Sequence, residues 1–273
     1  MDDKQLNLFS VPASPAKPTL PPAHRVPIVA TELADDALIA AISSAGFAEI
    51  VDLIREAGRR KLVAAIPTLK EICRLFAGFG IDRPVPEQVV VMEALAAIGG
   101  TEAAKVVADA ISRAEVTGPT LMDAMRTAAQ LGAVMPTMVL AKLLRDDNPQ
   151  VRADACRCAR LAPEITSALL DLLSDLHVGV QEAAGCALGR VGNTAGRQIL
   201  RRQLVAAPSG DVIEALAVIA TDDDIVLLGR TARSRPEFME PVLDALEGCE
   251  HPMAAKVARG LRFGSASRTS IAF

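Results

Sequence analysis

Two stretches of this chain decide its fold, because they repeat each other. "LLRDDNPQVRADACRCARLA" (residues 143–162) aligns with "LLSDLHVGVQEAAGCALGRV" (residues 172–191). Leu144 matches Leu173 and Asp146 matches Asp175, and the valines and alanines that follow keep the same spacing of 29 positions. Apolar residues within each stretch recur at helical intervals. The pattern predicts a repeated unit of two helices.

Further copies lie on both sides of this pair. "EALAAIGGTEAAKVV" (93–107), "EALAVIATDDDIVLL" (214–228) and "DALEGCEHPMAAKVA" (244–258) resemble one another, and the last two are offset by 30 residues. One helix pair cannot bury its apolar stripe alone, whereas stacked pairs bury a continuous core of small and aliphatic side chains. We therefore predict an all-α chain with six to seven helix pairs, stacked as an α-solenoid.

The pattern LLxDxxxxVRxxAxxAL, followed after a helix by glycine and a turn, resembles the HEAT repeat in the short form shared with bilin-lyase-type repeat proteins. The resemblance covers most of residues 45–262 and is most specific at 139–193. It implies an armadillo-like superhelix in which Asp146 and Arg152 belong to a ladder between units. Gln181 replaces the arginine in the next unit, which is expected to interrupt that ladder.

Proline, glycine and capping residues mark the expected helix boundaries. Asn148 and His251 are expected caps, and Ser234 with Glu237 has the spacing of a capping box. The glycines expected to close helices are Gly99, Gly100, Gly132, Gly192 and Gly248. The prolines expected in first turns are Pro67, Pro86, Pro119, Pro136, Pro149, Pro163, Pro236 and Pro252.

The chain divides into three parts by composition. Residues 1–33 are rich in proline and are predicted to form a disordered N-terminal arm; residues 34–263 form the solenoid, and residues 264–273 a loose tail. The start lacks the basic and apolar regions of a signal peptide, and no apolar run approaches a membrane span. The five cysteines contain no CxxC spacing. We expect buried thiols in a reducing cytoplasm, with no metal or other cofactor.

Composition and motifs favour binding over catalysis. Aromatic residues make up 3% of the chain, without Trp or Tyr, and the formal net charge is −4. No Ser/His/Asp or Cys/His set can be assembled from the sequence, and the glycines lack nucleotide-binding spacing. The acidic run Asp222, Asp223 and Asp224 follows Thr221 at an expected helix start, where carboxylates favour capping. The sequence predicts a non-catalytic protein-interaction scaffold.

Arginines form the main charged feature. No acidic residue occurs between Glu182 and Asp211, and equivalent positions recur one repeat later. Stacked units would align these side chains into a basic strip that could meet phosphates or an acidic protein surface. The alternative is a solvated face on which the arginine stems cover apolar surface. The strip comprises Arg190, Arg197, Arg201, Arg202, Arg230 and Arg259.

The N-terminal arm carries Gln5, Leu6, Asn7, Leu8 and Phe9. This pentapeptide resembles the motif by which bacterial replication and repair proteins bind the sliding clamp of DNA polymerase, with Asn7 as the departure from the usual Ser or Asp. The resemblance implies that Gln5, Leu6, Leu8 and Phe9 enter a preformed groove on the clamp while the arm acts as a tether. The alternative is that these residues pack on the first helices as a hydrophobic plug.

Two other function classes stay open from sequence. HEAT-like folds include alkylpurine DNA glycosylases, whose basic concave face and aromatic-flanked aspartate hold DNA, and bilin lyases, which hold a flat tetrapyrrole. The absence of Trp and Tyr counts against both. The preferred hypothesis is a bacterial adaptor, with a DNA-binding repair factor using the arginine strip as the alternative. The solenoid's own partner and its oligomeric state are not specified by the sequence.

Overall fold

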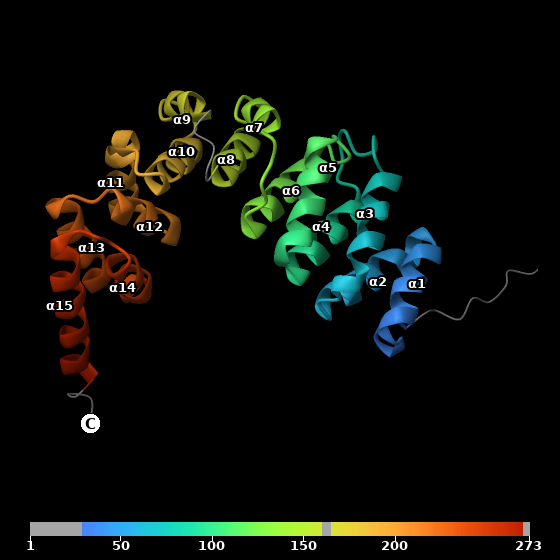
Figure 1. Cartoon of the computed structure of the whole chain (residues 1–273), viewed down its shortest axis with the longest axis horizontal. Coiled ribbons are helices and arrows are strands. Elements are labelled where there is room, and N and C mark those ends of the chain that lie inside the picture. Colours follow the sequence, from blue (N-terminus) through green and yellow to red (C-terminus); the bar gives the residue numbers. More distant parts are fainter. Residues whose placement is uncertain (1–28, 160–164, 270–273) are drawn as a thin grey trace, which may run out of the picture.

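A computed structural model describes residues 29–159 and 165–269 of the 273-residue chain. The described residues form fifteen α-helices and four short 3-10 helices, without a β-strand. Figure 1 shows the helices stacked in chain order into a continuous arch. The predicted all-α solenoid is confirmed. Residues 1–28, which include the clamp-like pentapeptide, lie outside the described residues.

The α-helices pack in two layers. Odd-numbered helices lie along the outside of the arch and even-numbered helices along its inside (Figure 1). The outer helices are α1 (Asp35–Ser44), α3 (Ile66–Leu75), α5 (Gly100–Ser112), α7 (Thr137–Leu143), α9 (Thr166–Leu172), α11 (Arg197–Ala206), α13 (Asp222–Ser234) and α15 (Pro252–Thr269). The inner helices are α2 (Phe47–Arg59), α4 (Pro86–Ile98), α6 (Gly118–Leu131), α8 (Pro149–Cys158), α10 (Val178–Arg190), α12 (Gly210–Val218) and α14 (Met239–Glu247). Seven successive helix pairs are thus followed by one terminal helix.

Small side chains bring neighbouring inner helices together. A Cβ atom on Gly58 of α2 would stand 2.8 Å from Ala94 Cα on α4, and one on Gly189 of α10 would stand 2.8 Å from the Ala215 carbonyl oxygen on α12. Both distances are shorter than real Cβ contacts allow, so these crossings require glycine. Leu, Ile, Val and Ala fill the space between the layers. Alanine-rich inner helices therefore account for the shortage of aromatic residues.

The two aligned units share their turn geometry and differ where the sequence differs. Arg152 donates from Nη1 to the Asp146 carbonyl at 2.8 Å, and Gln181 donates to the equivalent Asp175 carbonyl at 2.7 Å. Arg152 also bonds the Asp175 carboxylate of the next unit, at 2.9 and 3.0 Å. Gln181 stands where that arginine would recur, and Leu204 lies 29 positions after Asp175. The contact that Arg152 makes with the next unit is therefore not repeated one unit later.

Most of the predicted helix boundaries are confirmed. Asn148 Oδ1 accepts from Gln150 N at 2.9 Å, and His251 Nδ1 accepts from Met253 N at 3.3 Å. Thr221 and Asp224 form a capping box at the start of α13. Prolines occupy the first turns of α3, α4, α6, α8 and α15, whereas Pro136 precedes α7, Pro236 begins a 3-10 helix (Pro236–Phe238), and Pro163 lies outside the described residues. The other 3-10 helices are Ala30–Glu32, Val63–Ala65 and Thr194–Gly196.

Two predicted boundary residues are wrong. Ser234 does not begin a capping box with Glu237, because its hydroxyl donates to the Thr231 carbonyl within the last turn of α13. Such a local bond from side chain to backbone competes with capping of the next helix. Gly248 ends α14 with φ of −77°, so it does not use the left-handed conformation found at Gly99, Gly132 and Gly192. At the end of the chain, α15 continues to Thr269 and so includes the first six residues of the predicted tail.

No helix among residues 29–159 and 165–269 is long and apolar enough to cross a membrane. Cys73, Cys156 and Cys186 are buried, as expected, whereas Cys158 and Cys249 are half-buried. Burial raises the pKa of each of these three thiols to about 12. They are therefore protonated core residues at neutral pH rather than activated nucleophiles.

Candidate partner-binding groove

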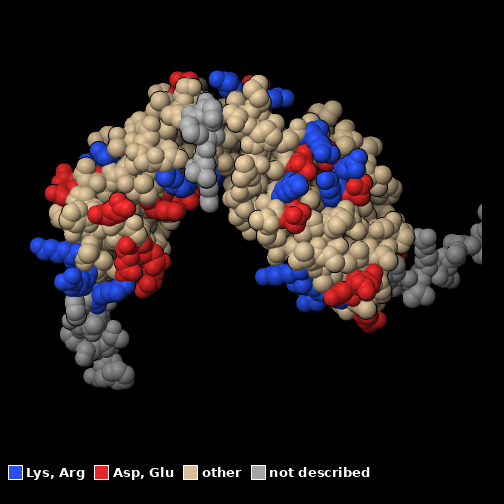
Figure 2. Space-filling view, in the orientation of Figure 1, with Lys and Arg blue, Asp and Glu red and all other residues tan. Residues whose placement is uncertain are grey.

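The concave side of the arch holds a groove where four inner helices meet. It has a volume of about 460 Å³ and crosses α6, α8, α10 and α12. Figure 2 shows the hollow underside of the arch, with Lys and Arg largely interspersed with Asp and Glu on the face in view. The residues that line the groove are Arg126, Ala129, Gln130, Gln150, Asp154, Arg157, Arg190 and Asp211.

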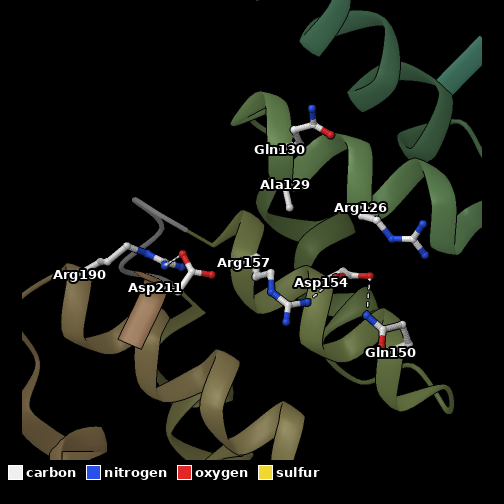
Figure 3. A pocket seen from close by; sticks show the side chains of 8 residues that line it. All are labelled: Arg126, Ala129, Gln130, Gln150, Asp154, Arg157, Arg190 and Asp211. Atoms are coloured by element: carbon white, nitrogen blue, oxygen red, sulfur yellow. Dashed lines mark hydrogen bonds and ion pairs between the residues drawn. The ribbon is translucent and has the colours of Figure 1, made fainter. Parts of the chain in front are cut away.

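A buried carboxylate organises the α8 wall of the groove. Asp154 is 1% exposed. Its Oδ1 accepts from Arg157 Nη1 at 2.5 Å and its Oδ2 accepts from Gln150 Nε2 at 3.1 Å. All three residues lie on one face of α8, because they are three and four positions apart. Asp154 therefore holds an arginine and a glutamine at the groove surface (Figure 3).

The opposite wall contains an arginine with unused donor capacity. The Arg190 side chain is 11% exposed and its Nη1 lies 3.6 Å from Asp211 Oδ1, an ion pair rather than a hydrogen bond. Its buried Nε has no acceptor among the described residues. Figure 3 shows Arg190 and Asp211 facing each other across the α10–α12 boundary. Because Nε is buried, its unpaired N–H group is a cost to the folded state and not a contact at the groove surface.

On α10, Glu182 lies two turns before Arg190 and Cys186 lies one turn before it. Burial raises the pKa of Glu182 above its ordinary 4.5; Asp211 acts in the same direction, while Arg157 and a bond from Ser209 oppose it. Burial also accounts for most of the rise in the pKa of Cys186 to about 12. The same helix that carries Arg190 thus holds a weakly solvated carboxyl group, and its thiol is not an activated nucleophile.

The three groove arginines are each matched by an aspartate. Arg126 pairs with Asp123 at 3.2 Å, Arg157 with Asp154 at 2.5 Å and Arg190 with Asp211 at 3.6 Å. The groove therefore offers guanidinium and amide donors beside carboxylate acceptors, with little net charge. In the described part of the chain, no cluster of three or more His, Cys, Asp or Glu residues could hold a metal ion. Such a surface is suited to forming hydrogen bonds and ion pairs with the polar groups of a polypeptide.

Sequence reasoning singled out only Arg190 from this set. The signal that could have found Arg126 and Arg157 is their repeat spacing, because they precede Arg190 by 64 and 33 positions and lie on successive inner helices. The predicted basic strip instead grouped Arg190 with arginines that the structure places on the outer helices α11, α13 and α15. The groove and the strip are therefore separate surfaces.

Two arginines of the predicted strip meet at a buried carboxylate. Arg201 Nε lies 3.2 Å from Asp224 Oδ1, and Arg197 Nε lies 3.6 Å from Asp224 Oδ2. Asp224 is fully buried and also caps α13. Arg197 further donates to the Ile219 carbonyl at 2.7 Å. The structure places Arg202, Arg230 and Arg259 in exposed positions on three different outer helices.

The comparisons with known proteins concern the fold. Residues 137–221 match a family model described as HEAT repeats. These residues run from α7 to Thr221, the residue before α13, and include α8, α10 and α12 of the groove. The match supports a HEAT-like helical repeat protein. One similar solved structure is an engineered protein from the Northeast Structural Genomics Consortium; it is 19% identical, and the alignment covers 81% of this chain and 92% of that chain with a TM-score of 0.30. No curated protein matches significantly.

Proposed function

We propose that this protein is a non-catalytic adaptor that binds a polypeptide in its concave groove. HEAT repeats generally serve as protein-interaction scaffolds, and the matched residues include three of the four groove helices. The observation that carries the proposal is a preformed groove whose α8 wall presents Arg157 and Gln150, both held in place by the buried Asp154. A backbone carbonyl or side-chain oxygen of a partner is the matching acceptor.

The charge balance of the groove favours a polypeptide over a nucleic acid. A phosphate backbone binds where unpaired lysines and arginines accumulate. Here every groove arginine has an aspartate within 3.6 Å. On the outer face, Asp224 likewise pairs with Arg197 and Arg201 at the centre of the predicted basic strip. DNA binding through that strip remains the alternative, and weakening of low-salt DNA binding by Arg201→Glu with Arg202→Glu would support it.

The groove can be tested with a matched pair of charge reversals. Asp211 and Asp223 are both exposed aspartates in the first turn of a helix, but only Asp211 lines the groove. Full-length protein is immobilised, and captured proteins are cross-linked and identified by mass spectrometry. Asp211→Arg should reduce capture of groove-cross-linked proteins at least fivefold, whereas Asp223→Arg should not. Equal capture by both variants, or cross-links confined to other surfaces, would refute groove binding.

We further propose that residues 5–9 tether the adaptor to the bacterial sliding clamp of DNA polymerase. The support is the sequence match of Gln5, Leu6, Leu8 and Phe9 to the clamp-binding pattern. A tether raises the local concentration of the solenoid near the clamp without any new contact. With such a tether the protein would act in replication or repair, in a bacterial cytoplasm.

The clamp proposal is tested with purified clamp and full-length protein. Leu8→Ala with Phe9→Ala should abolish capture, because these side chains supply the apolar anchors of such peptides. Ser10→Ala with Val11→Ala, just outside the pentapeptide, serves as the control and should capture the clamp normally. Equal capture by both double variants, or none by the wild type, would refute the tether.

A further inference from the structure

An exposed apolar surface lies at the N-terminal end of the solenoid. Phe47 begins α2, Leu75 ends α3, and Phe76, Phe79 and Ile81 follow in the α3–α4 loop; we call these five residues the apolar platform. Phe47, Leu75, Phe79 and Ile81 are 72%, 66%, 63% and 75% exposed. The platform surrounds a hollow of about 760 Å³. A contiguous patch of large apolar side chains marks a docking surface more often than scattered single residues do.

The platform concentrates the aromatic residues of a chain that has few. It contains three of the seven phenylalanines, and the chain has no Trp or Tyr. The Phe47 and Phe76 ring centroids are 5.8 Å apart, those of Phe76 and Phe79 are 6.4 Å apart, and both pairs pack edge to face. Phe76 also packs against the core, so it links the exposed rings to the folded body.

The exposure of the platform is built into the loop. Thr117 Oγ1 donates to the Phe79 carbonyl at 3.3 Å, and Val85 N donates to the buried Thr120 Oγ1 at 3.0 Å. Gly80, between Phe79 and Ile81, has φ of +83°, and a Cβ there would stand 2.5 Å from Val85 Cγ2. The loop backbone is thus fixed against α6 while Phe79 and Ile81 face outward. A preformed site of this kind costs little ordering entropy when it binds.

We propose that the apolar platform is the docking site of this chain's own residues 5–9, with Leu6, Leu8 and Phe9 as the side chains that cover it. Leu6, Leu8 and Phe9 are the densest group of large apolar residues before Val29. Their chemistry matches the platform, because aromatic and aliphatic side chains gain most from burial against exposed phenylalanine rings.

The position of the first described residues makes this contact reachable. Arg60, at the end of α2, donates to the carbonyls of Ala30, Thr31 and Leu33 at 2.7–3.1 Å. The chain therefore enters the solenoid at the C-terminal end of α2, whereas Phe47 begins the same helix. Thirteen helical residues span about 20 Å, which is the distance to be bridged.

The connecting segment has the length for this span. Phe9 stands twenty positions before Val29. Such a segment averages about 25 Å if flexible and reaches about 60 Å if its prolines extend it. The span lies within this range, near the length that maximises effective concentration, which is on the order of millimolar. Even a weak apolar contact is then well populated, yet a clamp that binds the same residues more tightly would displace it.

The inference is tested by photo-cross-linking in the full chain. With Phe9→p-benzoylphenylalanine at low micromolar concentration, irradiation should give monomeric cross-links to peptides that contain Phe47 or Phe79. Phe79→Ser with Ile81→Ser should reduce their yield at least fivefold. Val134→Ser with Met138→Ser is the control, because these apolar side chains are 87% and 82% exposed in the α6–α7 loop and the first turn of α7. A reciprocal probe, Ile81→p-benzoylphenylalanine, should cross-link to residues 5–25.

Each other outcome overturns the proposal. Cross-links that join two copies and rise with concentration would assign the platform to a second chain. Cross-links spread over the solenoid, or a yield unchanged by Phe79→Ser with Ile81→Ser, would show that residues 5–9 have no preference for the platform. Clamp capture is measured separately on the same variants, so loss of the clamp interaction with retained cross-links would refute the tether and leave this inference standing.

Discussion

Arg152 of α8 and Asp175 of the following unit are joined by two hydrogen bonds, at 2.9 and 3.0 Å, with both side chains largely buried. Arg152 also donates to the carbonyls of Asp146 and Asp147 in its own unit. Burial of Asp175 acts to raise its pKa, but the bonds from Arg152 and from His177 N outweigh burial and hold the pKa below its ordinary value. The Arg152 guanidinium therefore links the turns of two successive repeat units.

Removing this guanidinium should loosen the solenoid at its centre. Arg152→Ala leaves the Asp175 carboxylate and two turn carbonyls without their donor, at an expected cost of about 3 kcal/mol in the free energy of unfolding. Urea unfolding followed by circular dichroism measures the loss. Arg145→Ala, an exposed arginine in the same turn, should change stability by less than about 0.5 kcal/mol. Equal losses of stability in the two variants would contradict a stabilising role for the contact between Arg152 and Asp175.

The close crossing of α10 and α12 predicts opposite effects for two glycines of one helix. Gly189→Ala places a methyl group 2.8 Å from the Ala215 carbonyl oxygen and should destabilise the protein by about 1–3 kcal/mol. Gly179→Ala, in the first turn of α10, meets no atom within 4 Å and should stabilise it by roughly 0.5–1 kcal/mol. Thermal unfolding of both variants tests this, and a stabilising Gly189→Ala would refute the tight crossing.

Glu56 should contribute stability that is lost in acid. Its carboxylate accepts bonds from Arg59 and Arg60 at 2.6–2.7 Å, which lower its pKa from 4.5 to about 2. A carboxyl whose pKa is lower in the folded state stabilises above pH 4.5 and loses that contribution as the pH falls toward 2. The stability difference between wild type and Glu56→Gln should therefore shrink across this window. If the stability difference between the two proteins does not change with pH, protonation of Glu56 is not linked to folding.

Glu182 should show the opposite pH dependence. Burial raises its pKa above 4.5, so the folded state favours the protonated form and the carboxylate opposes folding at neutral pH. Glu182→Gln should match wild type below pH 4.5 and become more stable than wild type as the pH rises through the raised pKa. Denaturant midpoints measured from pH 4 to 8 test this. Loss of stability in Glu182→Gln at pH 7 would show that the carboxylate stabilises the folded state and would contradict this prediction.

The limits of sequence reasoning are clearest at Asp224. Its capping role at α13 was predictable from the Thr221 spacing, because capping is local. Its pairing with Arg197 and Arg201 was not, since those arginines belong to α11 and precede it by 27 and 23 positions. The sequence segment around Arg197 is free of acids, yet the stack brings a buried carboxylate to it.

The sequence by itself determined the helical unit, its period near 30 residues and most helix starts and ends. These features depend on apolar spacing, on proline and glycine geometry and on alanine at helix crossings, all of which are local or periodic. The tertiary structure decided which charges meet and which apolar residues stay outside. Arg157 and Arg190 share a groove, and Phe47 and Phe79 share a surface, only because successive units stack with a particular rotation. That rotation arises from contacts between helices, which no single repeat contains.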